Sequence, residues 1–445
     1  MTLSRLLFRT SLALLPGALG AQSQVTLTLG GAARMAAQQS GGSEIARTRV
    51  DQAGARVRQA KSLLFPTLTA SAGENERNQN TATFGFAFRD PSGKPVFDPN
   101  GQVLPAVKVL DLRGRAQANL VDFSVAARLG TVRQLVHVAE AEAAGAGDQA
   151  AALAAAAYVR AVRADAALGA RVADSTLAAE LLAIANDQLK AGVGILLDVT
   201  RARSQLSASR AQLIASRNER DRTRLDLRRI IGLAPSVDVV LADSLMALPV
   251  DAALPTAEEG TRVALARRAD IRSAAAQQVA AERNVAATKL ERLPTLGVFG
   301  DQGAIGSSSA HLLNTWTWGI QLSVPVFDGF RREGRLQEQH AQVREADARR
   351  RDLESQAAIE VRAALLDLAT ARELLAAAEE RLTLAQQELA QARERFTAGV
   401  TGNADAITAS LGINAARTQM VDARAAYQSA RVTLARAAGT VTDLP

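Results

Sequence analysis

The chain has 445 residues, of which 48% are hydrophobic but only 3% aromatic, and its formal net charge is +7. No Cys is present, so disulfides, a thiol nucleophile and thiolate metal ligands are excluded. Its three His residues lie far apart in the sequence, so we expect no metal site and no cofactor. The Arg residues alternate with Glu and Asp along helical segments, so we expect no nucleic-acid partner.

The N-terminus has the pattern of a secretory signal peptide. Two Arg residues precede an apolar run from Leu12 to Leu19, and a small-x-small pattern follows. We predict a signal peptide over residues 1–21, and no later window is apolar enough for a membrane helix. The protein is therefore expected to be exported, without a membrane helix and, lacking Cys, without an N-terminal lipid anchor.

The first half of the chain predicts a helix, two strands and a very long helix. A helix over about 44–64 ends before Pro66, and every second residue of the strand over 68–72 is apolar. In the second strand, apolar or small residues alternate with polar ones over 112–120. A helix is then expected over 122–192. At 1.5 Å per residue this helix reaches roughly 100 Å.

The connection between these strands, residues 82–101, is rich in Gly, Pro, Asp and Asn. We interpret it as a loop outside the cell. Three aromatic residues at strand spacing, Phe84, Phe86 and Phe88, could extend the first strand.

The second half repeats this plan. A helix is expected over 256–292, and it opens with Thr256 and Glu259 at capping-box spacing. A strand follows Pro294, and then comes "NTWTWGIQLSVPVF" (314–327). Apolar side chains fill every second position of this stretch, which predicts a ribbon with one apolar and one polar face. They are Trp316, Trp318, Ile320, Leu322 and Val324.

The two halves are related by a tandem duplication. Residues 189–213 align without a gap with 396–420, an offset of 207 that pairs Gly192 with Gly399. A unit of this length is too long for a solenoid repeat. We predict a first repeat over 22–233, a linker over 234–255 and a second repeat over 256–445.

The second long helix carries a heptad pattern, which predicts a left-handed coiled coil. Its seven-residue series is Val361, Leu368, Leu375, Leu382, Leu389 and Phe396. An Ala stands three positions after each of the first five, which permits close helix packing. The heptad pattern of the first long helix is weaker. Leu168, Leu182 and Leu189 fit the seven-residue spacing, but Ser175 interrupts it.

Four strands of about nine to eleven residues have the length that crosses an outer membrane when tilted. Unpaired backbone groups in lipid cost several kcal/mol each, so four strands cannot remain an open sheet there. Four are also too few to close a barrel, so several chains must share one. The pattern alone also allows a small soluble sheet beside the helices.

These segments resemble the TolC-like outer-membrane efflux proteins. The similarity runs from about Val25 to Gly439, and its clearest pieces are "LTLGGAARMAAQQS" (27–40), "LSVPVFDGFRREGRLQ" (322–337) and the tips "AGVGILLDV" and "AGVTGNADAI". It implies a mainly α fold with long coiled-coil hairpins and four strands per chain, which join a twelve-stranded barrel in a homotrimer. Members usually have Pro where this chain has Ala269.

The resemblance also implies a location in the outer membrane, extending into the periplasm, and a passive duct for efflux or secretion. Its partners would be outer-membrane lipid, a periplasmic adaptor and an inner-membrane pump. The lipid-facing residues would be Trp316, Trp318, Ile320 and Leu322.

At the periplasmic tips, Gly192 and Gly399 are expected to end helices, and Asp198 and Asp405 to cap the returning ones. The resemblance adds adaptor docking at both tips and a pore constriction at the second tip. The docking residues would be Gly192, Val193, Asp198, Gly399, Val400 and Asp405, and the constriction would lie at Asp405 and Thr408.

Members of the family hold this mouth shut with a polar and an Arg side chain near the second tip. This chain has Phe396 and Thr401 there.

Two other classes stay open at this point. A soluble periplasmic coiled-coil scaffold or adaptor would explain the heptads but not the Trp-faced strand. An enzyme is not expected, because no nucleophile–base–acid set or carboxylate pair with a shared context is present.

Overall fold

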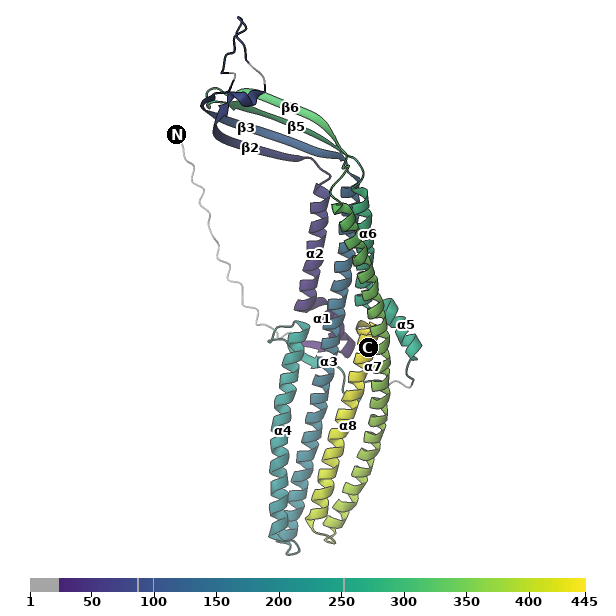
Figure 1. Cartoon of the computed structure of the whole chain (residues 1–445). Coiled ribbons are helices and arrows are strands. Elements are labelled where there is room, and N and C mark those ends of the chain that lie inside the picture. The colour runs from purple at the N-terminus through teal and green to yellow at the C-terminus, as the bar shows by residue number, and fades with distance from the viewer. Residues whose placement is uncertain (1–23, 86–87, 99, 251–252) are drawn as a thin grey trace, which may run out of the picture. The chain divides into compact units, whose positions relative to one another are not determined.

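The computed structural model describes residues 24–85, 88–98, 100–250 and 253–445 (Figure 1). The expected signal peptide, residues 1–21, and Phe86 lie outside this range. The fold has two compact units, each built from both repeats. We call them the helical unit (residues to Ile45, Ala144–Ala269, Glu354–Pro445) and the strand unit (Ala46–Ala143, Asp270–Leu353).

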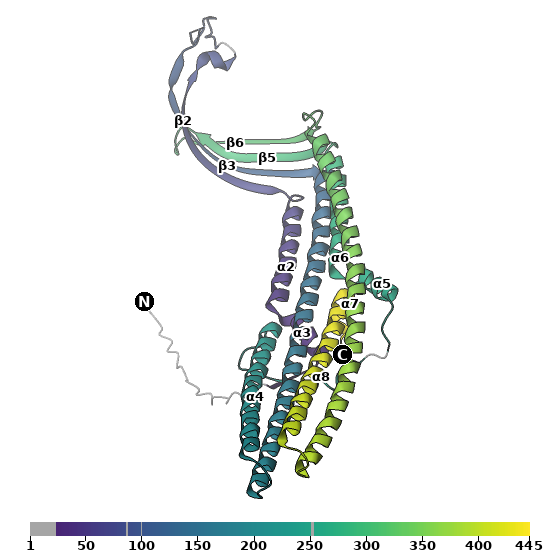
Figure 2. The same cartoon turned by 60° about the horizontal axis from the view of Figure 1, so that its bottom comes forward.

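The strand unit holds a four-stranded antiparallel sheet in the order β2-β3-β5-β6 (Figure 1). Its strands are β2 (Thr67–Asn80), β3 (Val103–Val121), β5 (Thr295–Gly306) and β6 (Leu313–Ser323). The predicted length of nine to eleven residues fits β6, which has 11, but is too short for β2 with 14 and β3 with 19. These two strands continue as a ribbon beyond the other two (Figure 2).

The predicted extension of β2 through the phenylalanines is wrong. Phe84 ends a 3-10 turn, η1 (Thr81–Phe84), in which the Ala82 amide donates to the Asn80 side chain. Gly85 then takes a positive φ of 71°, which stops the strand. The rings of Phe84, Phe88 and Phe97 pack edge to face in the loop, with centroids 5.7–6.4 Å apart.

Parts of four helices belong to the strand unit. These helices are α2 (Gly41–Ser62), α3 (Phe123–Lys190), α6 (Ala269–Leu290) and α7 (Arg331–Thr397). Glu291, directly after α6, binds Arg128 of α3 and Arg335 of α7. Partial burial raises the pKa of Glu291, but these guanidinium groups outweigh it and hold the pKa below its usual range. This carboxylate therefore ties the starts of both long helices to β5.

A single helix over 256–292 is wrong. The structure has α5 (Ala257–Arg267) and α6, separated by Arg268 in an extended conformation. Arg268 binds Glu360 and donates to the Ala437 carbonyl, so its side chain is tied to α7 and α8 (Asn403–Ala438). The first half divides in the same way at Ser40, into α1 (Leu29–Gln39) and α2. The predicted cap is confirmed, since Thr256 Oγ1 accepts from the Glu259 amide at 3.2 Å.

The helical unit contains two short parallel strands that the sequence did not predict, β1 (Gln24–Leu27) and β4 (Asp238–Leu241). Tyr158 of α3 is fully buried beside them, with its hydroxyl 2.9 Å from the Leu27 carbonyl and 2.8 Å from Asp243 Oδ2. Burial raises the pKa of Tyr158, so the hydroxyl stays protonated and can donate there.

The rest of this unit is made by α3, α7 and two returning helices of 36 residues each, α4 (Leu196–Ile231) and α8. A short 3-10 turn, η2 (Val441–Asp443), follows α8. The heptad stripe is confirmed for Val361, Leu368, Leu375 and Phe396, which are all at most 3% exposed, whereas Leu382 and Leu389 of the same series are only partly buried. The Ala positions from Ala364 to Ala385 are buried as well. Among the described residues, no helix is long and apolar enough to cross a membrane.

In α3 the interrupted heptad is replaced by a different buried stripe. Leu177, Leu181 and Ala185 are buried, whereas Leu182 and Leu189 are only partly covered. One turn earlier Asp174, 1% exposed, accepts from Arg171 at 3.1 Å and from Arg417 of α8 at 3.0 Å. Buried charge of this kind is stable only when paired.

Replacing Ala378 by Leu should destabilise the helical unit. Ala378 is fully buried, and overpacking such a site typically costs about 1–3 kcal/mol. The neighbouring Ala377 is exposed in the chain and provides a matched Ala→Leu control. Thermal melting of the helical circular dichroism signal in detergent should show a lower midpoint for Ala378→Leu than for Ala377→Leu. The reverse order would contradict the assignment of the Ala stripe.

Candidate functional site

The residues singled out in the sequence lie in two places. Trp316, Trp318, Ile320 and Leu322 lie on β6 in the strand unit. Both glycine turns and both acidic residues lie at the tips of the helical hairpins, in the helical unit.

One face of the sheet carries no charged side chain over the length shared by all four strands. Register places Trp318 beside Gly300, Gly300 beside Ala116, and Ala116 beside Leu68. The next row joins Trp316, Gln302, Gly114 and Ala70. Trp316, Trp318, Ile320 and Leu322 are 65–69% exposed, so the predicted apolar face exists and the chain itself does not cover it.

The other face of the sheet is polar and charged. Arg113 lies at its centre, where it binds Asp301 of β5 and donates to Asp111 Oδ1 and Thr315 Oγ1, both at 3.2 Å. Arg115 and Thr317 lie on the same face one row away. The cross-strand pairing keeps the charges on this side compensated.

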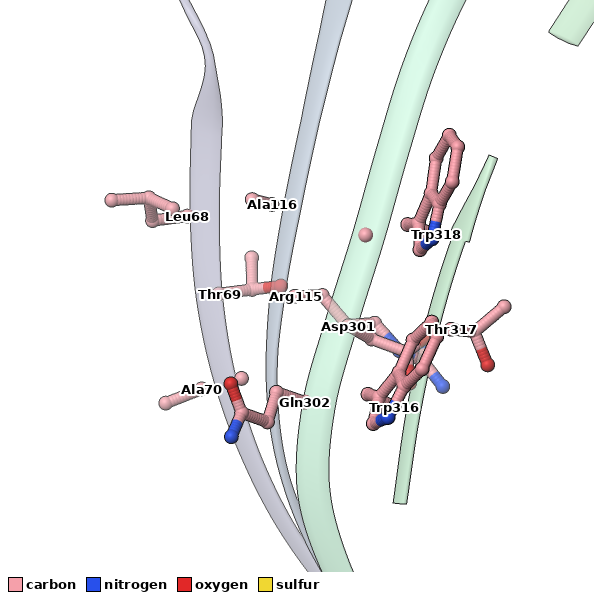
Figure 3. A pocket seen from close by; sticks show the side chains of 12 residues that line it. Leu68, Thr69, Ala70, Arg115, Ala116, Asp301, Gln302, Trp316, Thr317 and Trp318 are labelled. Carbon is pink, nitrogen blue, oxygen red and sulfur yellow. The ribbon is translucent and has the colours of Figure 1, made fainter. Parts of the chain in front are cut away.

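A hollow of about 730 Å³ lies over β3 and β5 on the uncharged face. Its floor includes Gly114, Ala116 and Gly300, none of which has a side chain larger than a methyl group. The indoles of Trp316 and Trp318 stand on one side of it, and Leu68 of β2 lies on the other (Figure 3). The hollow is therefore a trough between β6 and β2.

The glycine turns at the tips are confirmed. Gly192 has φ 78° and Gly399 has φ 70°, a left-handed conformation that favours Gly and ends α3 and α7. The valines that follow, Val193 and Val400, are 77% and 70% exposed. Each tip thus presents an apolar side chain that nothing in the described chain covers.

The prediction that Asp198 and Asp405 are N-caps is wrong. The caps are Ile195 and Gly402, whose extended backbones precede α4 and α8 without a side-chain bond. Both Asp residues lie one turn further, where the positive end of the helix dipole still favours an acid. They differ in environment, because Asp198 is buried whereas Asp405 and Thr408 are exposed.

Two side-chain amides join the hairpins close to the tips. Gln188 Nε2 donates to the Phe396 carbonyl at 2.7 Å, and Asn403 Nδ2 donates to the Asp198 carbonyl at 2.6 Å. Phe396 is buried among Leu181, Val199 and the apolar residues around them. Near the second tip, where the resemblance implies a polar latch, this chain has a buried ring and two amide–carbonyl bonds.

Sequence reasoning missed Gln188, Asn403 and the Arg113 cluster. No spacing rule signals an amide that binds a backbone carbonyl of another hairpin. Arg113 lies within the alternating stretch 112–120, but its partner Asp301 is known only once β3 and β5 pair. Among the described residues, no cluster of three or more metal-ligating side chains is present.

Comparisons with known proteins agree with this architecture. Residues 261–440 match the family model described as outer membrane efflux protein. Protein CyaE of Bordetella pertussis is 30% identical over 287 residues, which cover 64% of this chain and 60% of CyaE, so the match spans less than two thirds of that relative.

Two solved structures share the fold. The outer-membrane channel OprN has a TM-score of 0.73 at 20% identity, covering 93% of this chain and 90% of its own. The outer membrane protein VceC of Vibrio cholerae has a TM-score of 0.70 at 20% identity, covering 92% and 96%.

These matches confirm the predicted resemblance and the fold class. Residues 261–440 match the model of the outer membrane efflux protein family, and the fold is the one found in OprN and VceC. The description of that family agrees with the outer-membrane location expected from the sequence.

Removing the amide bonds between the hairpins should loosen the tips. Each such bond contributes about 1 kcal/mol, so Gln188→Ala or Asn403→Ala should speed amide exchange in the tip turns by about fivefold. The neighbouring Asp187, whose exposed side chain pairs only weakly with Lys190, provides the control Asp187→Ala. Hydrogen–deuterium exchange with mass spectrometry measures the rates. Equal exchange in all three variants would show that the amides do not fasten the hairpins.

Proposed function

We propose that the chain forms the outer-membrane channel of a tripartite efflux or secretion system. The observation that carries this proposal is the two-faced sheet, uncharged on one side and charged on the other. An uncharged exposed face suits lipid, and a face bearing Arg113, Arg115 and Asp301 suits a water-filled lumen. The family match and the fold of OprN support the same assignment.

A trimer would complete this channel. The sheet ends at β2 and β6, whose outer edges pair with no strand of the described chain. In lipid these backbone groups must find partners, and the four strands are too few to close on themselves. Three copies supply twelve strands in one barrel with an open lumen, and the pairing of β2 with β6 of a neighbour removes every edge.

The exposed residues at the hairpin tips indicate which partners the channel would bind. A periplasmic adaptor would dock on the two glycine turns, where Val193 and Val400 stand exposed, and would connect the channel to an inner-membrane pump. The channel itself is passive and no enzymatic step is assigned to it. A soluble scaffold is less well supported, because Trp316 and Trp318 do not pack into the interior of the chain.

Asp405 would form the constriction. It is exposed in the first turn of α8, with the exposed Thr408 three residues on. Three copies around a threefold axis would concentrate negative potential at the periplasmic mouth. The mouth would then favour cations.

Charge on the uncharged face should block insertion. Trp316→Asp and Trp318→Asp place a carboxylate against lipid, at a cost of up to about 2 kcal/mol each. Thr315→Asp, next to Trp316 on the opposite face, places its carboxylate beside Arg113, so it is the control and should be tolerated in the lumen. The yield of each variant in the outer-membrane fraction is the measurement. If both Trp variants insert as well as Thr315→Asp, the assignment of the faces fails.

Removing the acid at the mouth should reduce cation selectivity. Asp405→Asn takes three charges from the proposed ring, whereas Asp187→Asn changes an exposed acid near the other tip and is the control. Reversal potentials across a planar bilayer under a KCl gradient should shift toward zero for Asp405→Asn alone. The difference should shrink in high salt, because screening weakens the field. An unchanged reversal potential would exclude Asp405 as the constriction.

A further inference from the structure

We propose that the hollow over β3 and β5 is a binding site for one acyl chain of a membrane lipid. This inference rests on the proposed function, since it requires the uncharged face to contact the bilayer. It goes further, because it assigns a defined seat to one lipid rather than general contact with many.

The shape of the site supports a long, thin ligand. Gly114, Ala116 and Gly300 leave the backbone of two neighbouring strands uncovered, so the floor is flat and low. Trp316 and Trp318 form one wall and Leu68 the other (Figure 3). The trough between these walls follows the strands, so an extended chain would lie along it and contact both indoles.

The chemistry of the site selects hydrocarbon. Arg115 and Asp301 also border the hollow, but the register places their side chains on the opposite face of the sheet. Gln302 is the one polar side chain among the described lining residues that the register places on the face of the hollow. A chain in the trough contacts its floor and both walls, whereas a chain on the rim contacts one side only, so van der Waals contact favours the trough. A peptide would bring backbone groups that the trough cannot pair.

A polar anchor lies at a suitable distance on the same face. Along β2, Glu74 follows Ala70 by four residues, about 13 Å at 3.3 Å per residue. Glu74 pairs with Lys108 of β3 at 3.4 Å, and both side chains are exposed. Since half of a bilayer core is about 15 Å thick, a headgroup at this ion pair would place its own acyl chain in the hollow.

The floor can be filled without disturbing the sheet. A Cβ at Gly300 would meet nothing closer than Thr317 O at 3.6 Å, and one at Gly114 nothing closer than Gln302 O at 3.7 Å. Both are ordinary contacts. Gly300→Leu and Gly114→Leu therefore occupy the trough, whereas Ala72→Leu adds the same bulk to the same face beyond the residues that line it.

The two Trp residues of the chain, Trp316 and Trp318, both line the hollow. The tryptophan fluorescence of the protein therefore reports on this site alone. The full-length protein is reconstituted in phosphatidylcholine vesicles brominated at mid-chain, and quenching is compared with unbrominated vesicles. We expect strong quenching in the native protein and in Ala72→Leu. Gly300→Leu and Gly114→Leu should each lose about half of it, because the displaced chain no longer reaches both indoles.

Equal quenching in all four proteins would overturn the lipid seat and leave the proposed channel intact. Quenching by aqueous iodide but not by brominated lipid would place the indoles in water, which would reject the channel orientation and the seat together. The two Gly variants are independent, so a failure of one to insert leaves the other as the test.

Discussion

The unpaired backbone along β2 and β6 is the constraint on which the rest of the structure depends. Both edge strands expose a full row of amide and carbonyl groups, beside a face that carries exposed tryptophans and, over the length shared by all four strands, no charge. In water such an edge invites aggregation, and in lipid each unpaired group costs several kcal/mol. In the proposed trimer, pairing of β2 with β6 of another copy would satisfy both edges at once. The same pairing would separate an apolar outside from a lumen lined by Arg113 and its acidic partners.

The helices follow a different rule, close packing through small side chains. In α7 the buried Ala series beside Val361, Leu368 and Leu375 lets neighbouring backbones approach more closely than a Leu-only seam. This packing alone would allow the hairpins to slide or splay near the tips. There, the buried Phe396 ring and the amides of Gln188 and Asn403 give them a defined arrangement. Val193 and Val400 remain exposed beyond these fastenings.

The sequence predicted those elements whose periodicity is uninterrupted. Apolar residues alternate without fault from Trp316 to Leu322, and the α7 heptad continues without a break, so both emerged as expected. The outer part of β2 has polar residues on both faces, from Glu74 to Asn80, and therefore no alternation to detect. Its strand is held by backbone pairing with β3, which composition does not reveal.

The helix break at Arg268 illustrates a second limit. Neither Gly nor Pro marks the position, and the Pro usual in the family is Ala269 here, yet the backbone of Arg268 is extended. The side chain is held by Glu360 and the Ala437 carbonyl, groups about 90 and 170 residues away. Long-range contacts override local preference at Arg268. The tip acids were predicted to be caps from their residue type, but Ile195 and Gly402 occupy those positions.

The central claim is that β2 and β6 of different copies pair within one barrel, and disulfide cross-linking tests it most directly. The chain has no Cys, so one Cys can be introduced in β2 and one in β6 without competing thiols. The two positions are chosen on the outer edges of these strands, where they would face each other in the proposed pairing between copies. Within a single chain β3 and β5 separate these strands by roughly 14 Å, too far for a disulfide. In native outer membranes, oxidation should produce a covalent species of three chains on a denaturing gel. Single-chain protein at every register of Cys pairs along β6 would contradict the account.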